Sequence, residues 1–398
     1  MSHKERWTFK LTPFRYVLLT LGLAGAALSV YRLAFGLGSV TNLNDQWPWG
    51  LWIGFDVLTG VALAGGGYST CLLVYVLRIK KFKPVARSAM LTSLIGYLLV
   101  LAGLFLDIGR WYNFWRPFVY WGYHSVLFEV FWCVSLYTTV QLLEFSHVIT
   151  ERVGRKWHNT VVKILPVLFI IGIVLPTLHQ SSLGTLYVIE VGKLHPLWWS
   201  MLLPAFFLLS SFFVGPAMVG LETTLGGKAH GGGPDPDVLR SMTRVSAWLM
   251  LVYLALKVID LIYRGAVGFL LDGSLESNMF LLEMLAGVVI PLAISFSPLG
   301  RSRAGLTAFS VLVAAGVVIN RMNVVFTGMR SSLGGSYIPS PAEWLVSAGL
   351  VSLGVLAYLF IVENFEIMPA NKEQSHAYDP SPLKAGGKLS ATYFERGK

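Results

Sequence analysis

Ten apolar stretches, each long enough to cross a lipid bilayer, constrain the folding of this 398-residue chain more than any other feature. A spanning helix needs about 20 mainly apolar residues, because it rises about 1.5 Å per residue through a hydrocarbon core about 30 Å thick. The sequence therefore predicts an all-α membrane protein with ten transmembrane helices. The predicted spans are residues 14–37, 49–77, 85–108, 122–145, 157–180, 195–220, 238–264, 276–296, 304–327 and 341–362.

The composition excludes the soluble alternatives. Charged residues make up 13% of the chain, against about 25% in soluble domains, and hydrophobic residues make up 55%. The net charge of +10 would indicate a nucleic-acid partner in a soluble protein, but here it fits basic residues gathered on one side of a membrane. Cys71 and Cys133 both lie in apolar runs, which argues against a structural disulfide and against a four-cysteine metal or cluster site.

Lys and Arg residues indicate the orientation. Most of the 31 lie at the N-terminus, in alternate connections between spans and in the C-terminal tail. Because basic residues concentrate in cytoplasmic segments, both termini are predicted to be cytoplasmic. An even number of spans is consistent with this, since it places both termini on the same side of the membrane. The chain then divides into a cytoplasmic N-terminus (1–13), a ten-helix transmembrane domain (14–363) and a polar cytoplasmic tail (364–398) that we expect to be disordered.

Aromatic motifs at the outer ends of the second and sixth spans suggest an internal repeat. Trp47-Pro48-Trp49 and His195-Pro196-Leu197-Trp198 each mark a helix that runs inward. Spans two to five and six to nine would then form two four-helix bundles with the same up–down order, flanked by spans one and ten. The alternative is that these are the interfacial tryptophans common to membrane proteins.

Ionisable side chains inside spans are costly and rarely persist without a role. Counting about 1.5 Å per residue from the predicted outer ends places six of them in one layer near the outer surface. These residues are Asp56, Asp107, Arg110, His124, Glu129 and His179. Asp107 and Arg110 have a structural alternative as an ion pair three residues apart, and His124 has one as an ordinary interfacial histidine.

Three further positions suggest a route for protons. Glu129 has no basic neighbour within its own span, so it fits a proton relay better than an ion pair. Tyr97 lies near the middle of the third span, and Glu222 lies at the inner end of the sixth. We therefore predict a proton pathway through Glu129, Tyr97 and Glu222. The structural alternative for Glu222 is a solvated helix end.

The second bundle carries charges of both signs at comparable depth. These are Lys257, Asp260, Arg264, Glu283 and Arg321. Since opposite charges can neutralise one another inside a membrane protein, we interpret them as structural pairs rather than as a second reaction site.

The placement of histidines argues against a haem. Two histidines on facing helices can ligate a haem, and only His124 and His179 form such a pair near the outer side. Membrane cytochromes of the four-histidine type need further pairs, which the spans lack. Electron transfer by this chain would therefore need a partner that carries the redox clusters and a mobile carrier that binds here.

Several local motifs resemble one family of respiratory membrane subunits. They are Phe35-Gly36-Leu37-Gly38-Ser39-Val40, Trp49-Gly50-Leu51-Trp52-Ile53-Gly54-Phe55-Asp56, Asp107-Ile108-Gly109-Arg110, Ser125-Val126-Leu127-Phe128-Glu129, Leu175-Pro176-Thr177-Leu178-His179-Gln180, His195-Pro196-Leu197-Trp198 and Tyr263-Arg264. Through nearly all ten spans the chain is similar to the HybB-type integral membrane subunits of nickel–iron hydrogenases, within the wider NrfD and polysulfide-reductase membrane-subunit family.

The resemblance implies a haem-free subunit of the bacterial inner membrane that has no catalytic residues of its own. It would pass electrons between menaquinone or ubiquinone, bound by the six outer residues, and a periplasmic ferredoxin-like iron–sulfur subunit. Through that partner it would serve a catalytic subunit such as a nickel–iron hydrogenase. The aromatic outer loops 110–121 and 323–340 are expected to dock the partner.

The sequence leaves two other functions open. A secondary transporter and a haem-bearing membrane cytochrome b are the alternatives, since repeats and intramembrane charges are equally normal in transporters. The motifs do not choose the catalytic partner, the quinone species, the direction of electron flow, proton pumping or the oligomeric state.

Overall fold

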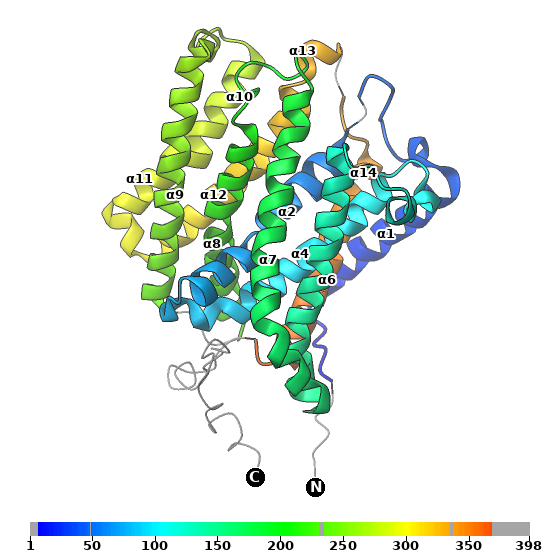
Figure 1. Cartoon of the computed structure of the whole chain (residues 1–398), viewed down its shortest axis with the longest axis vertical. Helices are drawn as coiled ribbons and strands as arrows, with labels where there is room; N and C mark the ends of the chain where they lie inside the picture. The colour runs from blue at the N-terminus through cyan, green and yellow to red at the C-terminus, as the bar shows by residue number, and fades with distance from the viewer. Residues whose placement is uncertain (1–6, 48, 154, 231–234, 335–336, 368–398) are drawn as a thin grey trace.

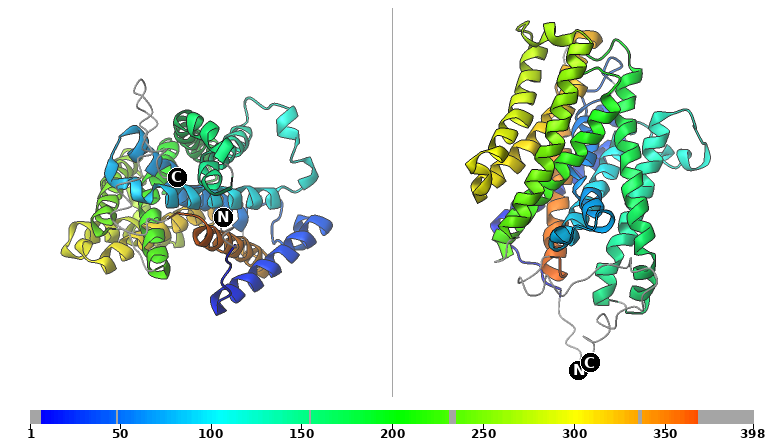
Figure 2. Two further views of the ribbon diagram at one scale, coloured as in Figure 1. Left: turned by 90° about the horizontal axis from the view of Figure 1, so that it is seen from below. Right: turned by 60° about the vertical axis from the view of Figure 1, so that its left-hand side comes forward.

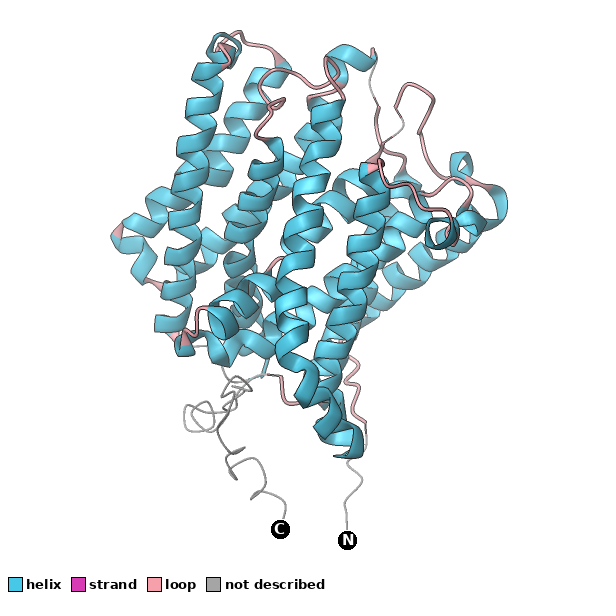
Figure 3. Cartoon of the chain, viewed as in Figure 1, coloured by secondary structure: helices cyan, strands magenta, loops and turns pink. Residues whose placement is uncertain are grey.

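The computed structural model describes residues 7–47, 49–153, 155–230, 235–334 and 337–367. These residues form helices joined by turns and loops, with no strand among them (Figure 3). Ten helical segments in the described ranges are long and apolar enough to span a membrane, which confirms the predicted fold class (Figure 1).

Seven of the spans are uninterrupted helices. They are α1 (Pro13–Phe35), α4 (Lys83–Asp107), α6 (Val126–Val153), α7 (Arg155–Ile189), α8 (Leu203–His230), α9 (Pro236–Tyr263) and α14 (Pro341–Asn364).

The other three spans are segmented, and each contains a π-helical stretch. The second consists of η2 (Trp52–Thr59), α2 (Gly60–Leu63), α3 (Gly66–Cys71) and η3 (Leu72–Val76). The eighth consists of α10 (Leu275–Met284), η7 (Leu285–Val289) and α11 (Ile290–Phe296), and the ninth of α12 (Arg303–Met322), η9 (Asn323–Thr327) and α13 (Arg330–Leu333). Such π-helical turns are rare and occur frequently at functional sites.

Several predicted boundaries were wrong, and two of them change where outer residues lie. α8 begins only at Leu203, so residues 195–199 lie in the connection before it and not within the sixth span. The backbone N–H of His195 donates to the carbonyl of Gly328 at 2.7 Å, and this bond fixes the connection against the ninth span. The predicted outer loop 323–340 is also partly helical, because η9 and α13 carry the ninth span on to Leu333.

The spans pack as two groups and a flanking pair. The second span, α4, α6 and α7 pack together, as do α8, α9, α11 and α12, whereas α1 packs mainly against α14. Seen from below, α1 and α14 run side by side at one edge of the molecule (Figure 2). This arrangement agrees with two four-helix bundles flanked by the first and last spans.

Glycines allow two close helix crossings. A Cβ atom at Gly25 of α1 would lie 2.8 Å from the Cα of Gly349 in α14, so this crossing requires that no side chain be present. A Cβ atom at Gly215 of α8 would lie 2.8 Å from the carbonyl oxygen of Gly65 in the second span. The second crossing joins the two bundles at the turn that interrupts the second span.

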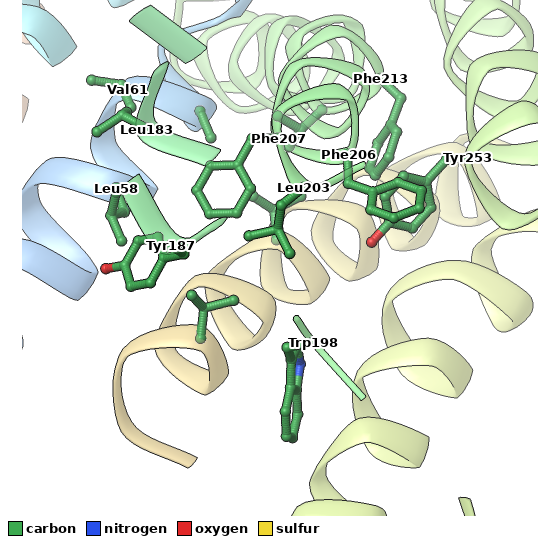
Figure 4. Packing of buried hydrophobic residues seen from close by; sticks show 14 of the residues in the cluster. Leu58, Val61, Leu183, Tyr187, Trp198, Leu203, Phe206, Phe207, Phe213 and Tyr253 are labelled. Atoms are coloured by element: carbon green, nitrogen blue, oxygen red, sulfur yellow. The ribbon is translucent and has the colours of Figure 1, made fainter. Parts of the chain in front are cut away.

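The largest cluster of buried apolar side chains is shared by both bundles (Figure 4). It includes Leu58 and Val61 of the second span, Leu183 and Tyr187 of α7, Phe206 and Phe207 of α8, and Tyr253 of α9. In the most apolar part of the second span 83% of residues are buried, compared with 22% in α1. The second span is therefore central, and its polar side chains meet protein instead of lipid.

The two ends of the described chain lie at the same end of the bundle, which we call the inner end. The backbone N–H of Thr8 donates to Asn364 Oδ1 at 2.9 Å, and Arg15 pairs with Glu363 at 2.5 Å. This agrees with an even number of spans, while the cytoplasmic placement of this end stays a prediction. Residues 1–6 and most of the predicted tail, 368–398, lie outside the described residues.

Candidate functional site

A fully buried tyrosine–histidine pair lies at the centre of the first bundle. The Tyr97 hydroxyl of α4 lies 2.7 Å from Nε2 of His179 on α7. The other ring nitrogen of His179, Nδ1, lies 3.0 Å from the carbonyl oxygen of Leu175. Since a carbonyl can only accept, Nδ1 carries the hydrogen, and in the neutral ring Nε2 accepts the hydrogen bond from Tyr97. A hydroxyl is thus held in line with a proton acceptor where water is excluded.

Polar side chains continue from this pair along the contact between α4 and α6. The ring of Tyr137 packs edge-on against Tyr97, with centroids 4.5 Å apart, and its hydroxyl lies 3.4 Å from Ser93 Oγ. Gln141 Nε2 donates to the same Ser93 oxygen at 2.5 Å. Ser93 and Tyr97 are four residues apart on α4, as are Tyr137 and Gln141 on α6, so each pair lies on one helix face.

Two further ionisable groups extend this row on α6 toward the inner end. Glu144 and His147 are both buried, and His147 Nδ1 lies 2.5 Å from the carbonyl oxygen of Glu144. Gly172 of α7 provides the room for the carboxyl, because a Cβ atom there would lie 2.5 Å from Glu144 Oε1. We call Ser93, Tyr97, Tyr137, Gln141, Glu144, His147 and His179 the inner polar row.

The inner polar row keeps unused hydrogen-bonding capacity. Gln141 Oε1, Glu144 Oε1 and His147 Nε2 are buried and have no hydrogen-bond partner among the described residues. Buried polar atoms are nearly always paired with protein groups or with ordered water. Gln141, Glu144 and His147 follow one another along one face of α6. Water molecules bound to their unpaired atoms would complete a chain of hydrogen bonds.

A second cluster of charged residues lies toward the outer end. Asp56 is carried by the π-helical η2 and accepts a hydrogen bond from Ser347 Oγ of α14 at 2.6 Å. Asp107, at the last residue of α4, has a buried Oδ1 with no hydrogen-bond partner in the part of the chain that the structure describes. Asp107 is within electrostatic reach of Asp56, Arg32 and Glu343.

Arg32 and Glu343 complete this outer cluster. Arg32 is fully buried in the last turn of α1 and donates to the carbonyl of Ile108 at 2.5 Å. The hydroxyl of Tyr337 donates to Glu343 Oε1 and accepts from the backbone N–H of Leu51 at 3.2 Å. Burial raises the pKa of Tyr337, so this hydroxyl keeps its proton and stays a donor. We call Arg32, Asp56, Asp107, Tyr337 and Glu343 the outer charged cluster.

Three of the six predicted outer residues do not join these clusters. Arg110 and His124 are exposed on the loop between α4 and α6, and Glu129 is exposed in the first turn of α6. α6 presents Val130 and Val134 to the core, and this turns Glu129 outward. The structure brings Asp56 near Asp107 and His179 onto Tyr97, and it leaves Arg110, His124 and Glu129 apart from them. A quinone site that involves all six residues stays a prediction.

Glu222 lies between helices that are distant in the sequence. Its Oε1 accepts hydrogen bonds from Ser88 of α4 and, at 2.8 Å, from the hydroxyl of Tyr358 in α14. The second oxygen, Oε2, is buried. The interpretation of Glu222 as a solvated helix end is therefore wrong. Ser88 lies on the same helix as Ser93 and Tyr97, which places Glu222 near the inner end of the α4 polar face.

Sequence reasoning missed most of the inner polar row, and one signal was available. Gln141, Glu144 and His147 follow one another at intervals of three residues, so they lie near one face of a helix. The predicted fourth span ended at residue 145, which put His147 in a loop. Arg32 and Glu343 carried no such signal, because their contacts depend on the packing of α1 and α14.

Of the five charges predicted to form structural pairs in the second bundle, only Asp260 and Arg264 form an ion pair among the described residues, and Glu283 is bonded to neutral donors. Glu283 accepts hydrogen bonds from Trp198 Nε1 at 2.9 Å, Asn320 Nδ2 at 2.7 Å and Asn323 Nδ2 at 2.9 Å. Asp260 forms an ion pair with Arg264 at 2.7 Å, as the interpretation of these charges as structural pairs requires.

Lys257 and Arg321 lie against aromatic rings instead of carboxylates. Lys257 Nζ lies 4.7 Å from the ring centre of Phe206. The guanidinium carbon of Arg321 lies 3.7 Å from the ring centre of Phe207. The same guanidinium group donates to Ser210 Oγ at 2.7 Å. Since both side chains are buried, these are favourable cation–π contacts.

Comparison with known proteins places the chain in a family. The family model described as "Polysulphide reductase, NrfD" matches residues 39–331. The chain is 35% identical to the "Probable Ni/Fe-hydrogenase 2 b-type cytochrome subunit" of Escherichia coli over 88% of its length and 91% of that protein. It is 29% identical to the "Menaquinone reductase, integral membrane subunit" of Nitratidesulfovibrio vulgaris, over 90% and 92% of the two chains. A third relative, at 23% identity over 89% and 94%, is the "Hdr-like menaquinol oxidoreductase integral membrane subunit" of Archaeoglobus fulgidus. The resemblance drawn from the motifs is thus confirmed, and the chain is a multi-pass membrane protein that belongs to the polysulphide reductase NrfD family.

Proposed function

We propose that this chain is the quinone-reactive membrane subunit of a respiratory oxidoreductase. It exchanges electrons between menaquinone or ubiquinone and a periplasmic ferredoxin-like iron–sulfur subunit, which in turn serves a catalytic subunit such as a nickel–iron hydrogenase. Support comes from the relatives, two of which are named for menaquinone or menaquinol chemistry and one as a hydrogenase subunit.

The observation that carries the proposal is the buried Tyr97–His179 pair and the polar row that leads from it. Reduction of a quinone to a quinol takes up two electrons and two protons, and oxidation releases them. The protons must enter and leave through donors and acceptors placed within hydrogen-bond reach. The inner polar row supplies hydroxyl, imidazole, amide and carboxyl groups in sequence through the first bundle.

We place the quinone headgroup in the outer half of the first bundle, between the outer charged cluster and His179. Asp56 and Asp107 exchange protons with the headgroup oxygens there, and Arg32 offsets their charge. Arg110, His124 and Glu129, which are exposed beside the aromatic loop 110–121, form the mouth of the site. The same loop, with residues 337–340, is the proposed docking surface for the iron–sulfur partner.

Proton movement to the inner end would follow the inner polar row. Tyr97 donates to His179 Nε2 and is replenished through Tyr137 and Ser93, with water completing the gaps beside Gln141 and Glu144. Glu222, bonded to Ser88 and Tyr358, is a second entrance from the inner end. In this proposal Glu129 acts at the outer mouth, Tyr97 in the middle and Glu222 at the inner end.

A haem does not fit the histidines proposed for it. Axial ligation needs two imidazole nitrogens that are free and face each other across the iron. His179 has one nitrogen engaged with Tyr97 and the other with Leu175, while His124 is exposed on an outer loop. The purified chain should therefore lack the absorption of a b-type cytochrome. A b-type spectrum from the purified chain would overturn the haem-free assignment.

The test is a conservative substitution at the centre of the row. Tyr97→Phe keeps the ring and its contact with Tyr137 but removes the hydroxyl. In membranes that contain the assembled complex, we expect the turnover of a menaquinol analogue to fall about tenfold or more. Tyr253→Phe, a buried tyrosine of the second bundle, is the matched control and should keep full turnover. Equal turnover in both variants contradicts the proposal.

A further inference from the structure

A cavity of about 580 Å³ opens at the inner end of the second bundle, far along the chain from the inner polar row. It lies between the first turns of α9 and the short connection from α11 to α12. Arg240 and Arg244 line it from α9, and Arg301 lines it from the connection. Its volume is in the range of sites that hold a small ligand.

The charge of this cavity is strongly positive. Arg240 and Arg244 lie four residues apart on one face of α9, a spacing at which like charges repel. Asp237 offers one carboxylate to Arg240 at 3.2 Å. Arg244 and Arg301 form no ion pair among the residues that the structure describes, and both are exposed. The three guanidinium groups therefore keep a surplus of positive charge that a bound anion would neutralise.

Two polar atoms in the wall of the cavity lack partners. Arg240 Nε and Ser295 Oγ are buried and make no hydrogen bond to any described residue. Both can donate, and a guanidinium group is the side chain whose geometry suits a phosphate best. These donors suit a ligand with several oxygen acceptors.

The position of the cavity indicates where that ligand comes from. Trp248 lies one turn beyond Arg244 on the same face of α9, is 63% exposed and packs against Phe296 at 5.9 Å. Phe296 is the last residue of the eighth span, and an exposed tryptophan that packs against such a span end next to arginines is typical of the headgroup level of a bilayer. The eighth span, Leu275–Phe296, has 22 residues against 28 in α9, so its inner end leaves the side of α9 open. The cavity therefore faces lipid headgroups at the inner leaflet.

We propose that this cavity binds the phosphate of an anionic phospholipid, with Arg240, Arg244 and Arg301 around the phosphate and Trp248 against the upper acyl chain. Basic pockets between transmembrane helices on the cytoplasmic side recognise such headgroups. The shared chemistry is a phosphate group, and the source to which we commit is the membrane lipid, not free phosphate. The bound lipid would tie the short eighth span to α9.

The experiment measures lipid binding by the purified full chain in detergent, using native mass spectrometry and thermal unfolding. The probes are dioleoylphosphatidylglycerol, dioleoylphosphatidylcholine and inorganic phosphate. The test variant is Arg244→Gln with Arg301→Gln. The matched control is Arg116→Gln, an exposed arginine on the outer loop. Arg244→Lys with Arg301→Lys keeps the charge and serves as a second variant if the first unfolds.

We expect phosphatidylglycerol to remain bound and to raise Tm, and phosphatidylcholine and phosphate to do neither. Each arginine removed should weaken binding about fivefold, because a basic side chain near an anionic headgroup contributes that much. The lysine variant should bind with intermediate strength, and Arg116→Gln should bind like the unmodified chain. Equal binding by the glutamine variant overturns the site, and stabilisation by inorganic phosphate alone overturns its assignment to lipid.

Discussion

The two bundles treat buried carboxyl groups in opposite ways. In the second bundle Glu283 accepts three hydrogen bonds and Asp260 is paired with Arg264. In the first bundle Glu144 and Asp107 each keep a buried oxygen without a partner in the described ranges, and so does the amide oxygen of Gln141. Both bundles lie in the same chain and share one apolar core, so the difference does not come from burial alone.

This difference separates groups that hold the structure from groups that can exchange protons. A carboxylate whose two oxygens both accept hydrogen bonds must lose at least one of these bonds when it takes up a proton. A carboxyl with an open oxygen can gain or lose a proton at little structural cost. We therefore assign proton exchange to the carboxyl groups of the first bundle and structural support to those of the second. Each substitution below tests one of these two assignments.

The largest effect is expected in the second bundle, on stability. Glu283→Ala leaves the donors of Trp198, Asn320 and Asn323 without an acceptor in a site closed to water. Such a loss costs about 3 kcal/mol, since several buried donors remain unpaired. Thermal unfolding of the purified protein would measure it. Glu276→Ala, in the first turn of the same helix, is the control and should change Tm little. If Glu283→Ala is as stable as the unmodified protein, Glu283 does not stabilise the second bundle.

The next effect is expected in the first bundle, on activity. Glu144→Gln keeps the size of the side chain and removes its ionisable proton, so turnover of a menaquinol analogue should fall about tenfold while Tm stays nearly unchanged. Glu129→Gln serves as a comparison, because Glu129 is an exposed carboxyl at the outer mouth and its loss should lower turnover less than the loss of Glu144. If Glu129→Gln abolishes turnover and Glu144→Gln does not, protons pass at the outer mouth and the inner polar row is structural.

The sequence predicted the fold well because length and hydropathy alone decide it. All ten spans exist, and the flanking role of the first and last spans agrees with the packing of α1 against α14. Boundaries failed where a tertiary contact decides them, as at His195, whose backbone is bonded to Gly328. No local pattern in the sequence reports a bond between residues so far apart.

The candidate site was predicted only in part, for a reason visible at Glu129 and Glu144. Depth in the membrane can be counted along a helix, but the face that a residue takes depends on its neighbours. Glu129 lies at a suitable depth and points outward, whereas Glu144 lies deeper and points at Gly172 of α7. Tyr97 and His179 were both singled out, but their bond connects two helices and required the structure.

The smallest effect concerns a histidine at the outer end of the second bundle, and it tests whether that bundle holds only structural groups. His195 lies in the connection before α8, and its Nδ1 accepts a hydrogen bond from the backbone N–H of Leu197 at 3.3 Å. Burial lowers the pKa of His195 from its ordinary value of 6.5, against the opposing effect of Glu276 and Asp272. The folded chain therefore binds the proton less readily than the unfolded chain does. As the pH falls through about 6.5, the unfolded state takes up the proton first, and stability decreases.

We expect Tm to fall modestly between pH 7.5 and 5.5, and His195→Gln to reduce that fall, because the variant has no imidazole to protonate. His124→Gln is the control, since His124 is an exposed histidine on the outer loop, and it should leave the pH dependence of Tm unchanged. Quinone turnover at pH 7.5 should be unchanged in His195→Gln, unlike in Tyr97→Phe. If His195→Gln instead lowers turnover without changing the pH dependence of Tm, then His195 carries protons, and the second bundle takes part in the reaction. That result would mean that each bundle holds a reaction site. The three hydrogen bonds that Glu283 accepts would then need an explanation other than structural support.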